Sequence, residues 1–362
     1  MKPEAIISAA EELLQAIDAT DQPAGEVINH YTRSRRYIGS KDRRHLTDLV
    51  WTYIRHQKRF EYLYPTKPLS DILSGIYNAA LPLPTHIPDA PDSVNFEMPD
   101  WLIPLIPNTE AELSALLEPA PVVLRAVKDR DTVRQHLMAE GIETTPTPRS
   151  PFGLFLTKRT NIQGTTAFRN GLIEVQDEGS QCLALATGIH PNDTVLDYCA
   201  GAGGKSLIFA QMMKNQGLIV AHDISERSLQ ELKRRASRAQ ATCIQVQKPL
   251  KSALYTHVVV DAPCSGTGTW RRFPDRRWKL TQEQFQTLLQ KQADILDKAV
   301  SFVALNGYLS YMTCSLTTAE NANQAQAFLT RHPDFVLIKE QAFTPATTQT
   351  DGFYLAQFQK IR

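Results

Sequence analysis

Two cysteines each follow an apolar run that predicts a buried strand. Residues 257–260 are His-Val-Val-Val, and the next four residues, Asp-Ala-Pro-Cys, end at Cys264. Residues 307–310 are Gly-Tyr-Leu-Ser, and the next five, Tyr-Met-Thr-Cys-Ser, contain Cys314. Open α/β sheets bind ligands at the carboxyl ends of their strands. We therefore expect both thiols to face one pocket, where a thiolate can act as a nucleophile.

Each of these residues also has a simpler structural interpretation. A single cysteine after a strand is usually a small buried hydrophobe, and Asp261 could simply begin a turn before Pro263. These interpretations do not explain the sequence Pro-Cys-Ser-Gly-Thr-Gly at residues 263–268, which is an unusual way to end a strand. The combination favours a chemical role for the segment.

A glycine-rich turn between a strand and a helix lies upstream of both cysteines. Residues 195–206 are Val-Leu-Asp-Tyr-Cys-Ala-Gly-Ala-Gly-Gly-Lys-Ser. Glycines let the backbone approach a ligand, and the helix start adds free N–H groups. The end of the turn, at Lys205 and Ser206, is similar to a P-loop, but a P-loop needs glycine where Cys199 stands. A dinucleotide turn of the G-x-G-x-x-G type would need glycine at Ser206.

The acidic residues around this turn favour S-adenosylmethionine as the cofactor. Asp197 ends the first strand, and Asp223 ends the second. Asp223 is placed to accept hydrogen bonds from both ribose hydroxyls, with the geometry that an acidic residue uses for NAD. Asp223 could instead cap the helix that starts near Ser225, but a cap leaves the glycine turn unexplained.

The composition is that of a globular protein without a strong overall charge. The 362 residues carry a formal net charge of +1, with 42% hydrophobic and 21% charged residues. Nucleic acid would therefore be bound through local patches. The five cysteines form no C-x-x-C pair, which argues against a metal site. An amphipathic start and the lack of an apolar run of about 18 residues predict no signal peptide, no membrane partner and a cytoplasmic location.

Strand-like and helix-like runs alternate from Gln176 onward. This alternation predicts a mostly parallel, doubly wound α/β sheet. Only a loop at residues 340–351 separates the last two strands, so we expect an antiparallel strand at one edge. The predicted strands are residues 195–199, 218–223, 243–246, 258–264, 307–314, 335–338 and 353–358.

Three further segments precede this predicted catalytic domain of residues 176–362. Residues 1–80 have helical periodicity and predict an all-helical amino-terminal domain. Prolines crowd residues 81–108, which predicts a linker. Residues 109–175 predict a small α/β RNA-binding subdomain, with a strand near 122–127 and a helix from about 131 to 140.

The second half of the chain resembles the Sun (RsmB-like) family of RNA 5-methylcytosine methyltransferases. The matching segments are residues 175–181 (entry motif), 197–206 (cofactor turn), 261–268 with 271–275 (motif IV), 313–315 (motif VI) and 351–354 (final strand). The resemblance implies a Rossmann-like class I methyltransferase sheet, S-adenosylmethionine as cofactor and RNA as partner. Residues 1–90 are similar, more weakly, to the helical part of some bacterial members.

The resemblance also implies a catalytic role for three residues. Cys314 would add as a thiolate to ring carbon 6 of cytosine, which makes carbon 5 nucleophilic enough to take a methyl group. Cys264 would help to release the covalent product, and Asp261 would hydrogen-bond or protonate ring nitrogen 3. A thiolate near neutral pH needs positive potential, for which Lys205, the bound sulfonium and a helix start after Ser315 are candidates.

Two positions depart from the family's pattern. Ala202 stands where the family usually has proline, which should loosen the turn without removing its N–H donors. The family's aspartate that holds the adenine is missing, and Gln247 could accept that hydrogen bond instead. The predicted cofactor-binding residues are Cys199, Ala200, Gly201, Ala202, Gly203, Gly204, Lys205, Asp223, Gln247 and Asp261.

Cations alternate with aromatic residues just after motif IV. Residues 270–279 are Trp-Arg-Arg-Phe-Pro-Asp-Arg-Arg-Trp-Lys, a pattern that suits phosphates and stacked bases or, more simply, a salt-bridged surface loop. The predicted RNA-binding residues are Arg271, Arg272, Arg276 and Arg277. A second basic cluster, residues 33–44, fits a solvated loop and a phosphate-contacting patch equally well.

The sequence therefore predicts an S-adenosylmethionine-dependent RNA cytosine-5 methyltransferase. Ribosomal RNA of the small subunit, 16S rRNA, is the favoured substrate, and transfer RNA is the alternative. Two other classes remain: a non-catalytic RNA-binding ribosome assembly factor with the same fold, and a P-loop enzyme. The presence of both cysteines argues against the assembly factor.

Overall fold

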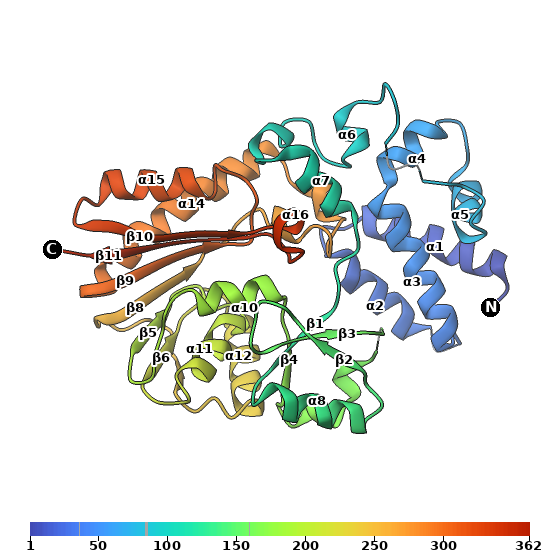
Figure 1. Ribbon diagram of the computed structural model, residues 1–362. Helices are drawn as coiled ribbons and strands as arrows, with labels where there is room; N and C mark the ends of the chain where they lie inside the picture. Colours follow the sequence, from blue (N-terminus) through green and yellow to red (C-terminus); the bar gives the residue numbers. More distant parts are fainter. Residues whose placement is uncertain (36, 84–85, 159) are drawn as a thin grey trace. The chain divides into compact units, whose positions relative to one another are not determined.

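The computed structural model describes residues 1–35, 37–83, 86–158 and 160–362. They form two compact units (Figure 1). The first unit comprises Met1–Pro119 and Thr269–Gln284, and the second comprises Ala120–Gly268 and Phe285–Arg362. Arg36 of the basic cluster and Pro84 of the proline-rich segment lie outside the described residues.

Helices make up the first unit within its described residues. In α1, residues Ile6, Ala10, Leu13, Leu14 and Ile17 are buried, as their helical spacing predicts. Its helices are α1 (Pro3–Asp18), α2 (Ala24–Ser34), α3 (Ser40–Arg55), α4 (Gln57–Leu63), α5 (Leu69–Tyr77), α6 (Asp92–Asn95), α7 (Thr109–Leu117) and α13 (Arg276–Lys279).

The proline-rich segment is more than the linker that we expected. Its described residues include α6 and a 3₁₀ turn at Ile103–Leu105, and the side chains of Met98 and Leu102 are fully buried. Pro91 is the residue before α6, and Pro104 lies in the first turn of the 3₁₀ segment. At such positions the missing N–H of proline breaks no helical hydrogen bond. The segment is therefore part of the first unit's core.

A segment from the middle of the predicted catalytic domain also belongs to the first unit. Asp275 accepts a hydrogen bond from the backbone N–H of Ala24 at 3.0 Å. Lys279 Nζ donates to the carbonyls of Thr20 and Gln22 at 2.8 and 3.2 Å. These bonds satisfy main-chain groups near the end of α1 and the start of α2. The division of the chain by contacts thus differs from the predicted boundary at residue 176.

A small antiparallel sheet begins the second unit, in the order β2-β3-β1-β4. Its strands are β1 (Val123–Ala126), β2 (Thr144–Pro146), β3 (Gly153–Leu156) and β4 (Ile173–Val175), with helices α8 (Arg130–Ala139) and α9 (Thr166–Arg169). Leu124, Leu137 and Ile173 are buried together in its core. This is the small α/β element that the sequence predicts.

A seven-stranded sheet forms the main layer of the second unit, in the order β10-β11-β9-β8-β5-β6-β7. The strands are β5 (Thr194–Asp197), β6 (Leu218–Ala221), β7 (Ile244–Val246), β8 (Tyr255–Asp261), β9 (Val303–Thr313), β10 (Phe335–Phe343) and β11 (Phe353–Lys360). Strands β7, β6, β5, β8 and β9 are parallel, and β11 is antiparallel to both β9 and β10. The predicted fold class is confirmed, but the reversed strand β11 lies one position inside the edge.

Helices cover both faces of this sheet. Val259 packs into a core with α10 (Glu178–Leu185) and α11 (Gly204–Met212). Its neighbours Val258 and Val260 pack into a second core with α14 (Gln282–Ala299) and α15 (Ala322–Arg331). Successive strand residues point to opposite faces, so a strand covered on both sides is apolar throughout. α12 (Glu226–Arg238) also contributes to the α10–α11 side through Ala236.

Candidate active site

The two predicted thiols lie side by side at the carboxyl ends of β8 and β9. These strands are parallel neighbours, with Asp261 paired to Met312 in the register. The Sγ atoms of Cys264 and Cys314 are 3.3 Å apart. The backbone N–H of Cys314 also donates to Cys264 Sγ at 3.3 Å. Two sulfurs from distant parts of the sequence therefore meet at one point above the sheet.

The surroundings of Cys264 favour its protonated form. The hydrogen bond with the Cys314 side chain, burial, and the nearby Cys314 and Glu320 charges all raise the pKa of the Cys264 thiol well above its usual value. Only the backbone N–H of Cys314 acts in the other direction. Cys264 therefore has the character of a proton-carrying group, which leaves Cys314 as the candidate nucleophile.

A lysine holds the carboxylate at the end of β8. Lys205 Nζ lies 3.1 Å from Asp261 Oδ2 and donates to Ser180 Oγ at 3.0 Å. The Lys205 side chain is 7% exposed, whereas that of Asp261 is 32% exposed. One edge of the Asp261 carboxylate is thus fixed by the ammonium group, and part of the carboxylate remains open to a ligand.

The glycine-rich turn has the backbone that its sequence requires. Gly201 and Gly203 have φ of +52° and +85°, in the left-handed region where glycine is favoured. A Cβ on Gly203 would lie 2.7 Å from Leu232 Cγ, whereas a Cβ on Gly201 or Gly204 would meet nothing within 4 Å. The turn therefore packs tightly against α12 at Gly203 and faces open space at its other two glycines.

Both acidic residues beside the turn are engaged by it. Asp223 Oδ2 accepts a hydrogen bond from Gly201 N at 2.9 Å, and Oδ1 accepts one from Ser225 N at 2.7 Å. Each carboxylate oxygen retains a lone pair for another donor. Asp223 can therefore bind a ribose while it also holds the turn that leads into α12. Asp197 Oδ2 accepts from Ser206 Oγ at 2.5 Å.

Burial dominates the titration of Asp197. The side chain is fully buried, and this burial, with the charges of Asp261 and Asp223, raises its pKa to about 7. The Ser206 hydrogen bond and Lys205 lower the pKa and only partly offset the burial. Asp197 therefore serves the turn as a buried hydrogen-bonding group.

Gln247 is partly occupied by its own loop. It follows β7, and its Oε1 accepts a long hydrogen bond of 3.4 Å from Lys251 N. The proposed contact of Gln247 with an adenine stays a prediction. Sequence analysis missed Ile224, which is 77% exposed immediately after Asp223. An apolar residue directly after a strand-end acidic residue is the signal that could have identified it as a candidate surface for an adenine ring.

The four predicted RNA-binding arginines lie in the first unit and differ in exposure. Arg277 is 1% exposed, and its Nη2 donates to the carbonyl of Leu116 at 2.7 Å. Arg271 is also buried, Arg272 is half-buried, and Arg276 is exposed with its guanidinium 4.7 Å from the centre of the Phe273 ring. In this structure the Arg277 guanidinium is turned to the protein interior, so only the more exposed members of the set are placed to meet a phosphate.

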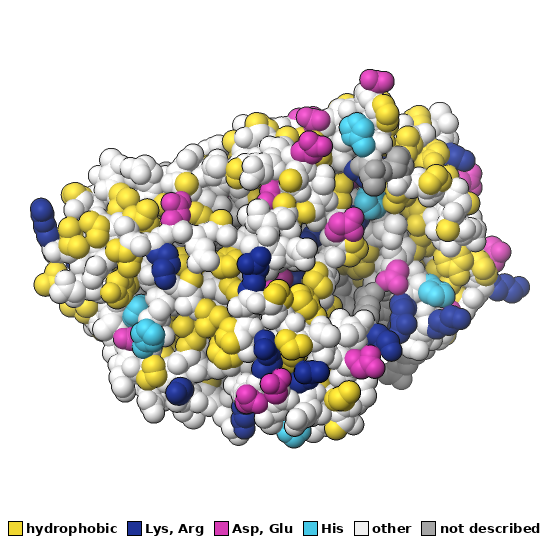
Figure 2. Space-filling view, viewed as in Figure 1, with side chains coloured by type: hydrophobic (Ala, Val, Ile, Leu, Met, Phe, Trp, Pro, Cys, Tyr) yellow, Lys and Arg dark blue, Asp and Glu magenta, His cyan; other side chains and the backbone are white. Residues whose placement is uncertain are grey.

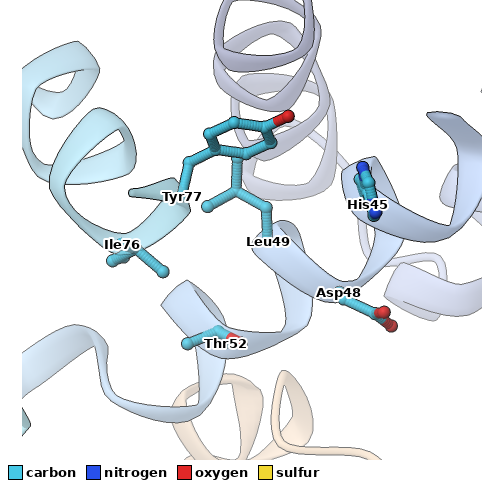
Figure 3. Close-up of a pocket in the computed structure, with 6 residues that line it drawn as sticks. All are labelled: His45, Asp48, Leu49, Thr52, Ile76 and Tyr77. Atoms are coloured by element: carbon cyan, nitrogen blue, oxygen red, sulfur yellow. The ribbon is translucent and has the colours of Figure 1, made fainter. Parts of the chain in front are cut away.

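An open depression of about 360 Å³ lies on the helical unit between α3 and α5. Figure 3 shows Tyr77 on α5, with His45 and Asp48 on α3, around it. The His45 and Tyr77 rings meet edge to face, 6.3 Å apart. It contains none of the predicted cofactor or catalytic residues.

No described helix is long and apolar enough to span a membrane. Within the described residues, no three His, Cys, Asp or Glu side chains are grouped so as to hold a metal ion. Figure 2 shows Lys and Arg side chains interspersed with Asp and Glu on the viewed face.

The order of the large sheet, with a glycine turn after β5, defines a Rossmann-like methyltransferase fold. The crystal structure of PH0851 matches with a TM-score of 0.81 at 20% identity and covers 99% of each chain. The structure of NSun6 from Pyrococcus horikoshii with SFG matches with a TM-score of 0.64 at 17% identity, over 70% of this chain and 94% of that one. At these identities the likeness establishes the fold alone.

Sequence comparison identifies the family. The family described as 16S rRNA methyltransferase RsmB/F matches residues 184–359. "Probable ribosomal RNA small subunit methyltransferase B" of Synechocystis sp. is 32% identical over 301 residues, which cover 73% of this chain and 67% of the relative. The protein of the same description from Bacillus subtilis is 34% identical over 215 residues, covering 57% of this chain and 48% of the relative. The chain belongs to the RsmB/F (Sun) family of methyltransferases, and its matches span about half to two thirds of these relatives' length.

Proposed function

We propose that this protein transfers a methyl group from S-adenosylmethionine to carbon 5 of a cytidine in small-subunit ribosomal RNA. The observation that carries the proposal is the 3.3 Å contact between Cys264 Sγ and Cys314 Sγ, next to the lysine-held carboxylate of Asp261. One thiol can attack the cytosine while the other, still protonated, hydrogen-bonds the attacking sulfur when it must leave. The relatives' descriptions as small-subunit ribosomal RNA methyltransferases support this substrate class.

The residues present fit the cofactor. The open space at Gly201 and Gly204 leaves room for a ligand against the backbone, and the N-terminus of α11 offers free N–H groups there. Asp223 would hold the ribose hydroxyls, and Ile224 would lie against the adenine. When bound, S-adenosylmethionine supplies an electrophilic methyl group.

The protein's own groups would carry the remaining chemistry. The Cys314 sulfur bonds to ring carbon 6, and the electron pair displaced from the C5–C6 double bond makes carbon 5 nucleophilic. Asp261 in its protonated form gives a proton to ring nitrogen 3, which balances the negative charge that the thiolate places on the ring. Lys205 then pairs with the carboxylate that remains. After carbon 5 is methylated, water takes the proton from it, the electron pair re-forms the C5–C6 double bond, and Cys314 leaves as a thiolate. Cys264, which is still protonated, assists this release by hydrogen-bonding the leaving sulfur.

Transfer of label from methyl-labelled S-adenosylmethionine to small-subunit ribosomal RNA tests the proposal. Nucleoside analysis should recover the label as 5-methylcytidine. Cys314→Ala should abolish transfer, whereas Cys182→Ala, which alters a buried cysteine in the core beside α11, should leave it intact.

Three other outcomes would contradict the proposal in different ways. Label in another nucleoside would exclude cytosine-5 chemistry. Label in transfer RNA alone would replace the substrate class. RNA binding without any transfer by the intact protein would favour an assembly factor.

A further inference from the structure

A buried carboxylate that the reaction scheme does not use joins the two thiol-bearing loops. Glu320 is 0% exposed and lies just before α15. Its Oε1 accepts hydrogen bonds from Ser265 N at 2.7 Å and Gln292 Nε2 at 3.0 Å. Its Oε2 accepts from Ser265 Oγ and from Thr317 Oγ1, the latter at 3.1 Å. The Glu320 side chain thus accepts two hydrogen bonds from Ser265, the residue after Cys264, and one from the loop that follows Cys314.

The neighbouring residue holds the other loop. Asn321 Oδ1 accepts from Thr313 Oγ1 at 2.6 Å, and its Nδ2 donates to the Ser315 carbonyl at 2.9 Å. Thr313 and Ser315 are the two neighbours of Cys314 in the chain. Two consecutive residues, Glu320 and Asn321, therefore bind both sides of Cys314 and the position after Cys264.

The four donors to the Glu320 carboxylate are one backbone N–H, one amide and two hydroxyls, and none of them carries a charge. They satisfy the carboxylate without neutralising it. The Glu320 charge raises the pKa of both Cys264 and Tyr311. The Tyr311 hydroxyl donates to the Glu320 carbonyl at 2.6 Å. Lys205, a cation of the same site, is paired with Asp261. The negative charge of Glu320 is therefore felt at the Cys264 sulfur.

We propose that Glu320 is a positioning residue that holds the Cys264 loop against Cys314 and keeps a negative charge beside the Cys264 sulfur. This inference rests on the proposed cytosine-5 reaction. Its consequence is that two chemically identical side chains take different roles in the reaction. The Glu320 charge adds to the Cys314 hydrogen bond and to burial, which also favour the neutral thiol of Cys264, and Cys314 is left as the sulfur that ionises and attacks.

The test uses Glu320→Gln, because glutamine keeps the size of the side chain and removes only its charge. The Ser265 and Thr317 hydroxyls can rotate to accept from the new amide. Alkylation of the RNA-free protein by iodoacetamide, resolved by site with mass spectrometry, should show Cys264 reacting at a pH lower by about one unit. The profile of Cys314 should move less. In the methylation assay, kcat should fall by roughly tenfold or more with little change in KM for RNA.

Two further variants make the test decisive. Glu231→Gln removes an exposed carboxylate of α12 and should leave both profiles unchanged. Ser265→Ala keeps the Glu320 charge and removes one donor. Ser265→Ala should lower kcat severalfold without moving Cys264 alkylation to lower pH. If Glu320→Gln does not fold, Ser265→Ala is the variant that tests the inference.

Each outcome separates the two proposals. If Glu320→Gln lowers stability but leaves the Cys264 profile and kcat unchanged, Glu320 is structural and the inference is overturned. Unchanged kcat in Ser265→Ala, with the alkylation profile also unchanged, overturns it in the same way. If the Cys264 profile shifts while the wild-type protein makes no 5-methylcytidine, the charge effect stands and the proposed reaction fails.

Discussion

Cys264 differs from Cys314 in its hydrogen bonding more than in its position. Its sulfur accepts the Cys314 backbone N–H and contacts the Cys314 sulfur, and its pKa is raised. A thiol that stays protonated in this way is suited to act late in the reaction, when the Cys314 sulfur is released. The two cysteines should therefore fail in different ways when they are replaced.

Replacement of Cys264 by alanine should trap the covalent intermediate. Without the second thiol, Cys314 can still attack and carbon 5 can still be methylated, but release is slowed. Incubation with RNA and cofactor should give a protein–RNA adduct that survives denaturing electrophoresis. The double variant Cys264→Ala/Cys314→Ala should give no adduct, and normal turnover by Cys264→Ala would remove its role in release.

The buried carboxyl of Asp197 should make stability depend on pH. Its folded pKa, raised to about 7 by burial, lies above its ordinary value of 3.8. Between these values the folded state binds the proton and the unfolded state does not, so this group's contribution to stability falls as pH rises and levels off above about 7. Asp197→Asn should therefore gain stability relative to wild type between pH 4 and 8, by up to about 4 kcal/mol.

Urea unfolding of the cofactor-free protein at several pH values measures this difference. Glu231→Gln, at an exposed site, should follow the wild-type profile throughout. If Asp197→Asn also runs parallel to wild type, Asp197 is ionised in the folded protein and the argument from burial is wrong.

For individual residues, the sequence predicted the reactive side chains but few of the groups that they contact. Cys264, Cys314 and Asp261 could be predicted because each follows an apolar strand whose end defines the site. The ion pair of Asp261 with Lys205 and the bond of Glu320 to Ser265 could not, because these partners lie 56 and 55 residues apart in the chain and their contacts depend on packing. Arg277 was misleading because a cation in a basic run gives no sign of burial.

The glycine turn is the element whose sequence and geometry agree most closely. Gly203→Ala would place a side chain at φ +85° and bring its Cβ to 2.7 Å from Leu232. We expect a loss of stability of about 1–3 kcal/mol and at least tenfold weaker binding of S-adenosylmethionine by calorimetry, because the turn must shift.

Gly188→Ala is the matched control for that substitution. Gly188 has φ +66°, but a Cβ there would meet nothing within 4 Å. It should lose only about 1 kcal/mol and bind the cofactor normally. Equal loss of stability in both variants would mean that backbone strain, and not the contact with Leu232, accounts for the destabilisation by Gly203→Ala.

Most elements of the second unit were predictable because period-2 and helical patterns alternate there. The position of β11 was not: a loop between the last two strands indicates an antiparallel pair, and it does not say which of them lies next to β9. α6 and α13 were also missed. Each has four residues, which is too short for a periodic pattern.

Across the whole molecule, two neighbouring arginines should separate folding from RNA binding. Arg277→Leu removes a buried donor to the Leu116 carbonyl and should destabilise the first unit by about 1–3 kcal/mol. Arg276→Leu changes an exposed side chain and should leave the melting temperature unchanged. It should weaken RNA binding and lower the slope of log K against log salt by about one.

Thermal melts and salt-dependent RNA binding on both variants check this prediction. Loss of RNA affinity in Arg277→Leu without any loss of stability would show that its guanidinium reaches RNA after all. An unchanged salt slope in Arg276→Leu would remove it from the RNA surface.

The division into units was the least predictable feature of the molecule. Motifs place residues 269–284 in the catalytic domain, but Asp275 and Lys279 bond to main-chain groups between residues 17 and 24. A short segment that interrupts the sequence of one unit can complete the core of the other unit. This is visible only in the folded chain. A motif-based boundary follows the order of the chain and cannot detect such an exchange.

The 3.3 Å sulfur contact has a practical consequence for handling the protein. A disulfide bond needs the sulfurs at about 2.05 Å, so only a small movement separates the working pair from a cross-linked one. Dissolved oxygen or peroxide can accept the two electrons that disulfide formation releases. The disulfide would block the nucleophile and inactivate the protein. Purification in air should give inactive material that dithiothreitol restores, whereas adduct formation with RNA by Cys264→Ala should not need dithiothreitol.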